Sequence, residues 1–190
     1  MNSPDSKSSL RQQMRAALGK ISLAVRTVES MELCARLEPQ LQSAHTILFY
    51  APMADELDVW PLLEKLLKTG KICALPAYDE TTRTYCARRV TNLESDIVTG
   101  KFDVREPATD CEIVPFNRFD LVIVPGVSFD LAGNRLGRGL GFYDRILGKA
   151  SGVKCGVAYD FQLQASIPVE AHDARVNFIF TPTRCVRRKS

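Results

Sequence analysis

The residues best suited to chemistry lie in one short stretch, where arginines and an aspartate alternate with glycines. Arg135 and Arg138 can offer planar guanidinium groups to phosphate oxygens. Asp144 lies just beyond them, and a carboxylate beside bound phosphates repels them unless a cation lies between. Mg²⁺ suits that position, because it usually takes one or two carboxylates together with phosphate oxygens. These residue types therefore predict a site for phosphate groups and magnesium.

The neighbouring elements would position this stretch at the edge of a sheet. The apolar run 121–124, closed by Pro-Gly, predicts a buried strand, and a helical pattern starts near Phe142. Glycine lets the backbone come close to a ligand, and unpaired N–H groups at a helix start favour an anion. The glycine spacing matches neither the dinucleotide fingerprint nor the P-loop. The glycines alone therefore leave a flexible turn with solvated arginines equally open. The three glycines are Gly137, Gly139 and Gly141.

A second basic segment lies near the N-terminus. Lys7, Arg11 and Arg15 are spaced four residues apart, so a helix from about Ser8 would carry them on one face. A bound polyanion would relieve their mutual repulsion, but a solvated basic face is the plainer interpretation.

Acidic residues follow the apolar run 46–50, which predicts another strand. The loop contains Met53, Asp55, Glu56 and Asp58 and leads into a leucine-rich helix. Asp58 can cap that helix, because a side-chain oxygen there can accept from the first free N–H groups. Ligands of parallel sheets also bind at the carboxyl ends of strands, so the same loop is a candidate binding segment.

The whole chain predicts one α/β domain, residues 1–190, with a mostly parallel sheet. We expect disorder at residues 1–6 and in the basic tail 184–190. The net charge of +3 does not call for a nucleic-acid partner, and no apolar run is long enough to span a membrane. The six scattered cysteines fit free thiols in a reducing cytoplasm better than disulfides or zinc ligands.

The complete stretch resembles the signature of the 5-formyltetrahydrofolate cyclo-ligase family. The resemblance rests on Pro-Gly at 125–126, Phe-Asp at 129–130 and the string Gly-Asn-Arg-Leu-Gly-Arg-Gly-Leu-Gly-Phe-Tyr-Asp-Arg at 133–145. Lys7-Ser-Ser-Leu-Arg11 is similar to the family's N-terminal Lys-x-x-x-Arg, which is directed at ATP phosphates. The resemblance implies a three-layer α/β/α fold, similar to that of the glucosamine-phosphate isomerase and CoA-transferase group.

The resemblance also implies roles for individual residues. Arg135, Arg138 and Asp144 would be catalytic, and Asp144 would hold Mg²⁺ with Asn177, where the family usually has aspartate. Phe102 could stack on a pterin or belong to the core. The folate side would comprise Met53, Glu56, Asp58 and Phe102. The ATP side would comprise Lys7, Arg11, Arg135, Leu136, Gly137, Arg138, Gly139, Leu140, Gly141, Phe142 and Tyr143.

The expected reaction is ATP- and Mg²⁺-dependent conversion of 5-formyltetrahydrofolate to 5,10-methenyltetrahydrofolate. A cytoplasmic monomer acting on a folate that can carry a polyglutamate tail is expected. Two alternatives stay open: departures from the family pattern at Val59, Asp103 and Asn177 support the first, and the likeness of phosphate sites on a shared fold supports the second. One is a non-catalytic binder of folate or nucleotide, and the other is an enzyme resembling phosphosugar isomerases.

Overall fold

A seven-stranded sheet crosses the molecule in the computed structural model, which describes residues 4–100, 104–170 and 173–188. The strand order is β12-β11-β9-β6-β1-β2-β3. Neighbours from β11 to β2 are parallel, whereas β12 and β3 pair antiparallel at the two edges. The expected mostly parallel sheet is therefore confirmed. The strands are β1 (Thr46–Leu48), β2 (Ile72–Asp79), β3 (Thr84–Val90), β6 (Leu121–Pro125), β9 (Val153–Val157), β11 (Phe178–Phe180) and β12 (Cys185–Arg187).

Smaller elements decorate this sheet. One short sheet combines β7 (Ser128–Asp130), β8 (Arg135–Leu136) and β10 (Leu163–Gln164). Another pairs β4 (Ile97–Thr99) with β5 (Arg105–Pro107). Two single-turn 3₁₀ helices lie at Phe116–Arg118 and Asp160–Gln162.

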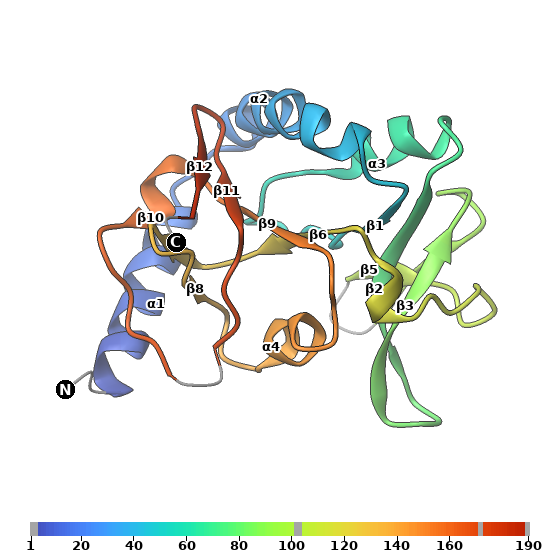
Figure 1. The fold of residues 1–190 in the computed structure, drawn as a ribbon. Helices are drawn as coiled ribbons and strands as arrows, with labels where there is room; N and C mark the ends of the chain where they lie inside the picture. Colours follow the sequence, from blue (N-terminus) through green and yellow to red (C-terminus); the bar gives the residue numbers. More distant parts are fainter. Residues whose placement is uncertain (1–3, 101–103, 171–172, 189–190) are drawn as a thin grey trace.

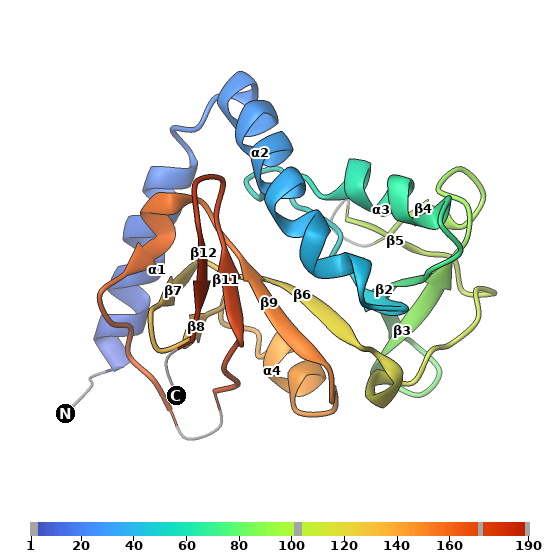
Figure 2. The same ribbon diagram turned by 45° about the horizontal axis from the view of Figure 1, so that its top comes forward.

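Helices cover both faces of the sheet, as Figures 1 and 2 show. The helices α2 (Leu23–Gln42) and α3 (Trp60–Leu67) lie on one face, and α4 (Phe142–Leu147) lies on the other. The helix α1 (Pro4–Leu18) lies at the side of the small β7-β8-β10 sheet. Leucines of α2 and α3 fill one core cluster, whereas Ile146 and Leu147 of α4 fill the second. The three-layer α/β/α fold is therefore confirmed, and its likeness to the isomerase and CoA-transferase group stays a prediction.

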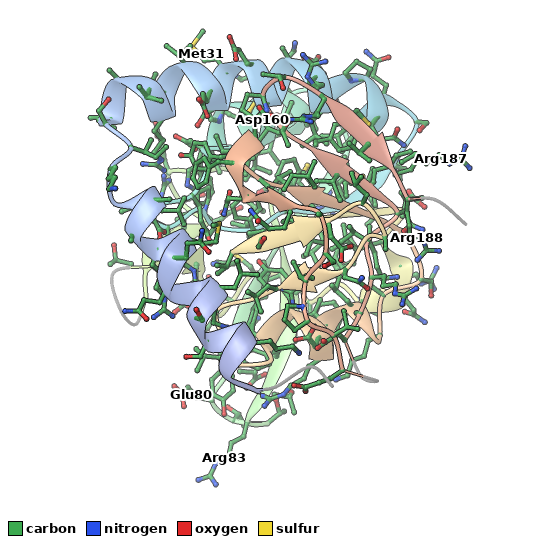
Figure 3. The ribbon with its side chains drawn as sticks, turned by 90° about the vertical axis from the view of Figure 1, so that its left-hand side faces the viewer. Met31, Glu80, Arg83, Asp160, Arg187 and Arg188 are labelled. Carbon is green, nitrogen blue, oxygen red and sulfur yellow. The ribbon has the colours of Figure 1, made fainter. Side chains whose placement is uncertain are left out.

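The helix α2 is longer than its sequence predicts. The sequence predicts a helix from about Thr27 to Leu37 or beyond, which Pro39 interrupts or ends, whereas α2 begins after Ser22 and continues past Pro39 to Gln42. The Ser22 hydroxyl oxygen accepts a hydrogen bond from the backbone N–H of Val25, which caps the helix start. Leu33, Leu37 and Leu41 are fully buried, so packing on the sheet outweighs the backbone hydrogen bond that proline removes. Figure 3 shows Met31 on the outer side of this helix.

Disorder at residues 1–6 and 184–190 stays a prediction, although the described residues of both segments include parts of regular elements. The helix α1 begins at Pro4, and residues 185–187 form β12 against β11. The turn between those strands is fixed by Asp160, whose carboxylate accepts from Thr181, Thr183 and Arg184. These charge-assisted bonds hold a basic segment that composition alone marks as mobile.

The six cysteines are all free thiols, as predicted. Cys73 and Cys155 are buried in the sheet. In the described part of the chain, no helix has both the length and the apolar character needed to cross a bilayer.

Candidate active site

The N-terminal helix and the glycine loop are in direct contact. Arg11 Nε of α1 donates to the carbonyl oxygen of Gly137 at 2.9 Å. Beneath this contact, Met14 packs with Leu136 in a small buried cluster that ties α1 to β8. Two segments that are distant in sequence, and that were predicted to share a site, therefore lie side by side.

Lys7 lies one turn before Arg11 and faces a different partner. Its Nζ is 2.8 Å from Asp173 Oδ2 and 3.2 Å from Glu170 Oε1. Burial acts to lower the pKa of Lys7, but the bonds to the two carboxylates outweigh burial and the net pKa shift is upward. Lys7 is thus held as a cation at the loop that follows β10.

Arg135 and Asp144 form the innermost ion pair of the site. Arg135 Nη2 lies 2.9 Å from Asp144 Oδ1, and Arg135 Nη1 lies 3.5 Å from the carbonyl oxygen of Pro125 at the end of β6. The Arg135 side chain is only 3% exposed, whereas that of Asp144 is 23% exposed. Arg135 Nε is buried without a hydrogen-bond partner. This arginine therefore supports Asp144 from behind, and the carboxylate reaches the surface.

The glycine loop, residues 137–141, packs against the side chains of Arg135 and Arg11. A Cβ on Gly137 would lie 2.7 Å from Arg135 Nη1, so a side chain there would collide with the buried guanidinium. Gly139 has a φ of +103°, which L residues with a side chain rarely adopt, and it lies against Arg11. The loop thus needs glycine for two separate physical reasons.

Arg138 points to the acidic loop after β1. Its guanidinium pairs with Asp55 and lies 3.2 Å from Glu56 Oε1. Glu56 Oε2 also accepts from the Met53 N–H at 3.0 Å. Burial raises the pKa of the Glu56 carboxyl above its usual value, although the bonds from Met53 and Arg138 oppose that shift. Ion pairs therefore connect the glycine loop to the acidic loop that follows β1.

A small cavity of about 10 Å³ lies behind this junction, lined by residues of both loops. Its wall includes Tyr50, Glu56, Gly126, Arg138 and Gln162. That volume is room for about one water molecule, far below the roughly 300 Å³ typical of small-molecule sites.

Comparisons with known proteins give the family of this fold and site. The profile of the 5-formyltetrahydrofolate cyclo-ligase family matches residues 3–182. The chain belongs to that family. It is 34% identical over 150 residues to the 5-formyltetrahydrofolate cyclo-ligase of Escherichia coli K12, covering 77% of this chain and 82% of the relative. It is 32% identical to the enzyme of that name from Mycolicibacterium smegmatis, covering 96% of each chain. The NMR structure of Aquifex aeolicus 5,10-methenyltetrahydrofolate synthetase superimposes with a TM-score of 0.87 at 32% identity, covering 97% of this chain and 93% of the other.

In this cyclo-ligase family member, the loop residues predicted to face ATP differ in exposure. Leu140 is 80% exposed at the tip of the loop, whereas Leu136 is 2% exposed and packs against α1. Phe142 packs edge-on against Tyr85, with ring centroids 4.4 Å apart. Tyr143 lies between both core clusters, beneath Arg135. Leu136 and Tyr143 therefore shape the loop from below, and their contact with ATP stays a prediction.

The residues predicted to bind folate lie in different environments. Met53 and Glu56 lie at the junction described above, with Met53 37% exposed. Asp58 Oδ1 accepts from the N–H of Trp60, the first residue of α3, at 2.9 Å, although Val59 and not Asp58 occupies the N-cap position. Phe102 lies outside the described residues.

Asn177 has a different environment from Asp144. Its side-chain oxygen accepts from the backbone N–H of Lys154 at 2.8 Å, at the start of β9. Lys154 pairs with Val122, about 10 Å along the strands from the Pro125 end where Arg135 and Asp144 lie. Joint metal binding by Asp144 and Asn177 therefore stays a prediction, and it would require Asn177 to leave this backbone bond.

Two residues that build the site, Asp130 and Gln162, were given no role from the sequence. Asp130 is buried and accepts from Ala132, Asn134 and Ile167, so its carboxylate fixes the start of the glycine loop. Gln162 Nε2 donates to the carbonyl oxygens of Gly126 and Val127 and fixes the Pro-Gly turn. The Phe-Asp pair in the family signature marked Asp130, but no pattern in the sequence marked Gln162.

Proposed function

We propose that this protein converts 5-formyltetrahydrofolate and ATP to 5,10-methenyltetrahydrofolate, ADP and phosphate. The observation that carries the proposal is the contact of Arg11 with the glycine loop, in a chain that belongs to the cyclo-ligase family. That contact joins the two cationic segments that a triphosphate would need. We propose a monomer in the cytoplasm, acting on a folate with or without a polyglutamate tail.

The nucleotide side would consist of cationic side chains near the glycine loop. Arg11 and Arg138 would neutralise the triphosphate at the loop, together with Lys7, which lies one helical turn before Arg11 on α1. Lys7 and Arg138 would exchange their present carboxylate partners for phosphate oxygens. Leu140 would lie beside the nucleotide, because it is the exposed tip of the same loop.

Asp144 fits the requirement for magnesium. One of its oxygens pairs with Arg135, and the carboxylate is partly exposed, so the other oxygen could bind a cation beside phosphates. Among the described residues, no group of three or more histidine, cysteine, aspartate or glutamate side chains could hold a metal. A single carboxylate fits Mg²⁺, which keeps water and substrate phosphates as its other ligands. When bound, Mg²⁺ would offset the negative charge that develops on the transferred phosphoryl group.

Arg135 would act through Asp144. Its guanidinium is buried and paired, so we assign it to orienting the carboxylate instead of touching phosphate. The reaction requires no covalent enzyme intermediate, because ATP activates the substrate directly.

The chemistry requires the formyl oxygen and the γ-phosphate to meet between the two loops. The formyl oxygen attacks the γ-phosphorus, the bond to ADP breaks, and an N5-iminium phosphate forms. N10 then attacks the formyl carbon and loses its proton, and the carbon–oxygen bond breaks to release phosphate. Holding the reactants in line and balancing charge supply most of the catalysis in such transfers. Met53 and Glu56 would line the folate side, because Glu56 lines the cavity shared with Arg138 and accepts from the Met53 N–H.

The test is to incubate the protein with 5-formyltetrahydrofolate and MgATP and to follow the absorbance of the methenyl product. Product formed with equimolar ADP is the expected result. Binding of both ligands without product would instead indicate a non-catalytic family member. Failure to bind either ligand would contradict the proposal and favour the isomerase-like alternative.

A further inference from the structure

Arg138 is predicted to bind phosphate, but its guanidinium is directed to the acidic side chains of the folate side. It lies in the glycine loop that would hold phosphates, yet its guanidinium is bound to the acidic loop on the folate side. The Asp55 and Glu56 side chains that hold it are 32% and 16% exposed, so this contact is largely shielded from solvent. An ion pair with that degree of shielding is screened less by salt than an exposed pair.

The contact also closes the site. Asp55, Glu56 and Arg138 form one side of the cavity whose volume is about 10 Å³. A folate ring system cannot enter a space of that size, because small-molecule sites usually need about 300 Å³ or more. Separation of Arg138 from the two carboxylates would open this side.

The loop allows that separation. Arg138 lies between Gly137 and Gly139, and Gly139 already has a backbone conformation that side chains disfavour. Arg11, at the same loop, donates to the backbone carbonyl oxygen of Gly137. Phosphates bound near Arg11 would therefore attract Arg138 away from Asp55.

We propose that Asp55 is a positioning residue that couples the two substrates of the proposed reaction. With no nucleotide bound, Asp55 holds Arg138 against Glu56 and keeps the folate side closed. A triphosphate draws Arg138 to itself, which opens the cavity and frees Glu56 to accept from N–H groups of the folate. Each substrate thereby increases the affinity for the other, because binding coupling is reciprocal. This inference rests on the proposed function.

The test measures affinity and coupling without turnover. Calorimetry would give the dissociation constants of the Mg²⁺ complex of a β,γ-imido ATP analogue and of 5-formyltetrahydrofolate, each alone and with the other present. The proteins are wild type, Asp55→Asn, the charge-conserving Asp55→Glu, and the control Asp110→Asn, which replaces an exposed acid outside the site. Thermal unfolding of each variant verifies that it is folded.

The coupling factor decides the outcome. We expect about 5-fold or more in wild type, Asp55→Glu and Asp110→Asn. Asp55→Asn should bind the analogue alone about 5-fold more tightly and show a coupling factor near 1. Unchanged coupling in Asp55→Asn would overturn the proposal even if the analogue bound more tightly, because loss of charge alone would explain that gain.

The same titrations separate this inference from the proposed function. Wild type that binds both ligands without coupling would overturn the role of Asp55 and leave the cyclo-ligase activity standing. Wild type that binds neither ligand would overturn both. If Asp55→Asn does not fold, Asp55→Glu becomes the deciding variant. A coupling factor of Asp55→Glu that differs from wild type would then refute the role of Asp55.

Discussion

Arg135 and Asp144 form an ion pair, 2.9 Å long, in which the guanidinium is almost fully buried and the carboxylate reaches the surface. Because of this asymmetry, a substitution of either residue changes the environment of the other. Removing the carboxylate leaves a buried, uncompensated positive charge, which in other proteins costs about 3–5 kcal/mol. The stability and the activity of the site are therefore tied together at Asp144.

Replacing Asp144 should separate these two effects. Asp144→Ala should lose about 3 kcal/mol of unfolding free energy, because Arg135 loses its partner. Asp144→Asn keeps an oxygen that can accept from Arg135 but loses the negative charge, so it should be less destabilised than Asp144→Ala, yet it should lose Mg²⁺-dependent turnover. Urea unfolding and turnover at several Mg²⁺ concentrations measure both quantities. Wild-type turnover by folded Asp144→Asn would refute the magnesium role.

Gly137→Ala tests whether the loop is shaped around Arg135. The new methyl group would lie 2.7 Å from Arg135 Nη1, and that guanidinium has little room to move because it is buried. We expect a loss of about 1–3 kcal/mol in stability and a lower kcat, because Asp144 would shift with Arg135. Gly148→Ala is the control, since its methyl group would make an ordinary contact, 3.4 Å from the Asp144 carbonyl oxygen. Equal stability and kcat in the two variants would show that Gly137 has no such role.

The fold was largely predictable because most elements have local signals. Apolar runs marked the parallel strands, and the leucines after Asp58 marked α3. The strand β12 and the full extent of α2 have no such local signal, because long-range packing decides them. Nothing near Cys185 indicates that it pairs with Phe180, and nothing near Pro39 indicates that the sheet stabilises the helix around it.

The site was predictable in composition but not in its pairing. The family signature identified Arg135, Arg138 and Asp144, yet it assigned both arginines to phosphate. Only the structure shows one buried behind Asp144 and the other bound to Asp55. Sequence cannot supply this distinction, because the direction of a side chain in a glycine-rich loop depends on distant loops.

Asp120 should make stability depend on pH at the amino end of the sheet. Its Oδ2 accepts from the backbone N–H groups of Thr46 at 2.9 Å and His45 at 2.8 Å. These two hydrogen bonds lower the pKa of the Asp120 carboxyl below its usual 3.8. Because the folded-state pKa is the lower one, ionised Asp120 stabilises the protein above about pH 4 and loses that effect as the pH falls through the folded-state value.

Asp120→Asn should therefore lose about 1 kcal/mol at pH 7, and the difference from wild type should shrink at acid pH. Urea midpoints at pH 7 and pH 3 measure this, with Asp110→Asn as the control for removing an exposed negative charge. A difference from wild type that stays constant across both pH values would contradict the assignment.

Arg11 and Arg15 offer the sharpest comparison for the nucleotide site. They are one helical turn apart on α1, but Arg11 is partly buried against Gly137, whereas Arg15 is exposed. Charged groups that bind charged partners commonly contribute about 1.5–3 kcal/mol, so Arg11→Ala should raise the KM for ATP by about 10-fold or more. Arg15→Ala should change that KM by less than about 2-fold, since an exposed charge interacts weakly through water. Initial rates at varied ATP and saturating 5-formyltetrahydrofolate measure both constants. If the two substitutions changed the KM for ATP equally, Arg11 would contribute only to the general surface charge. If Arg11→Ala changed only the KM for folate, Arg11 would bind the folate and not ATP.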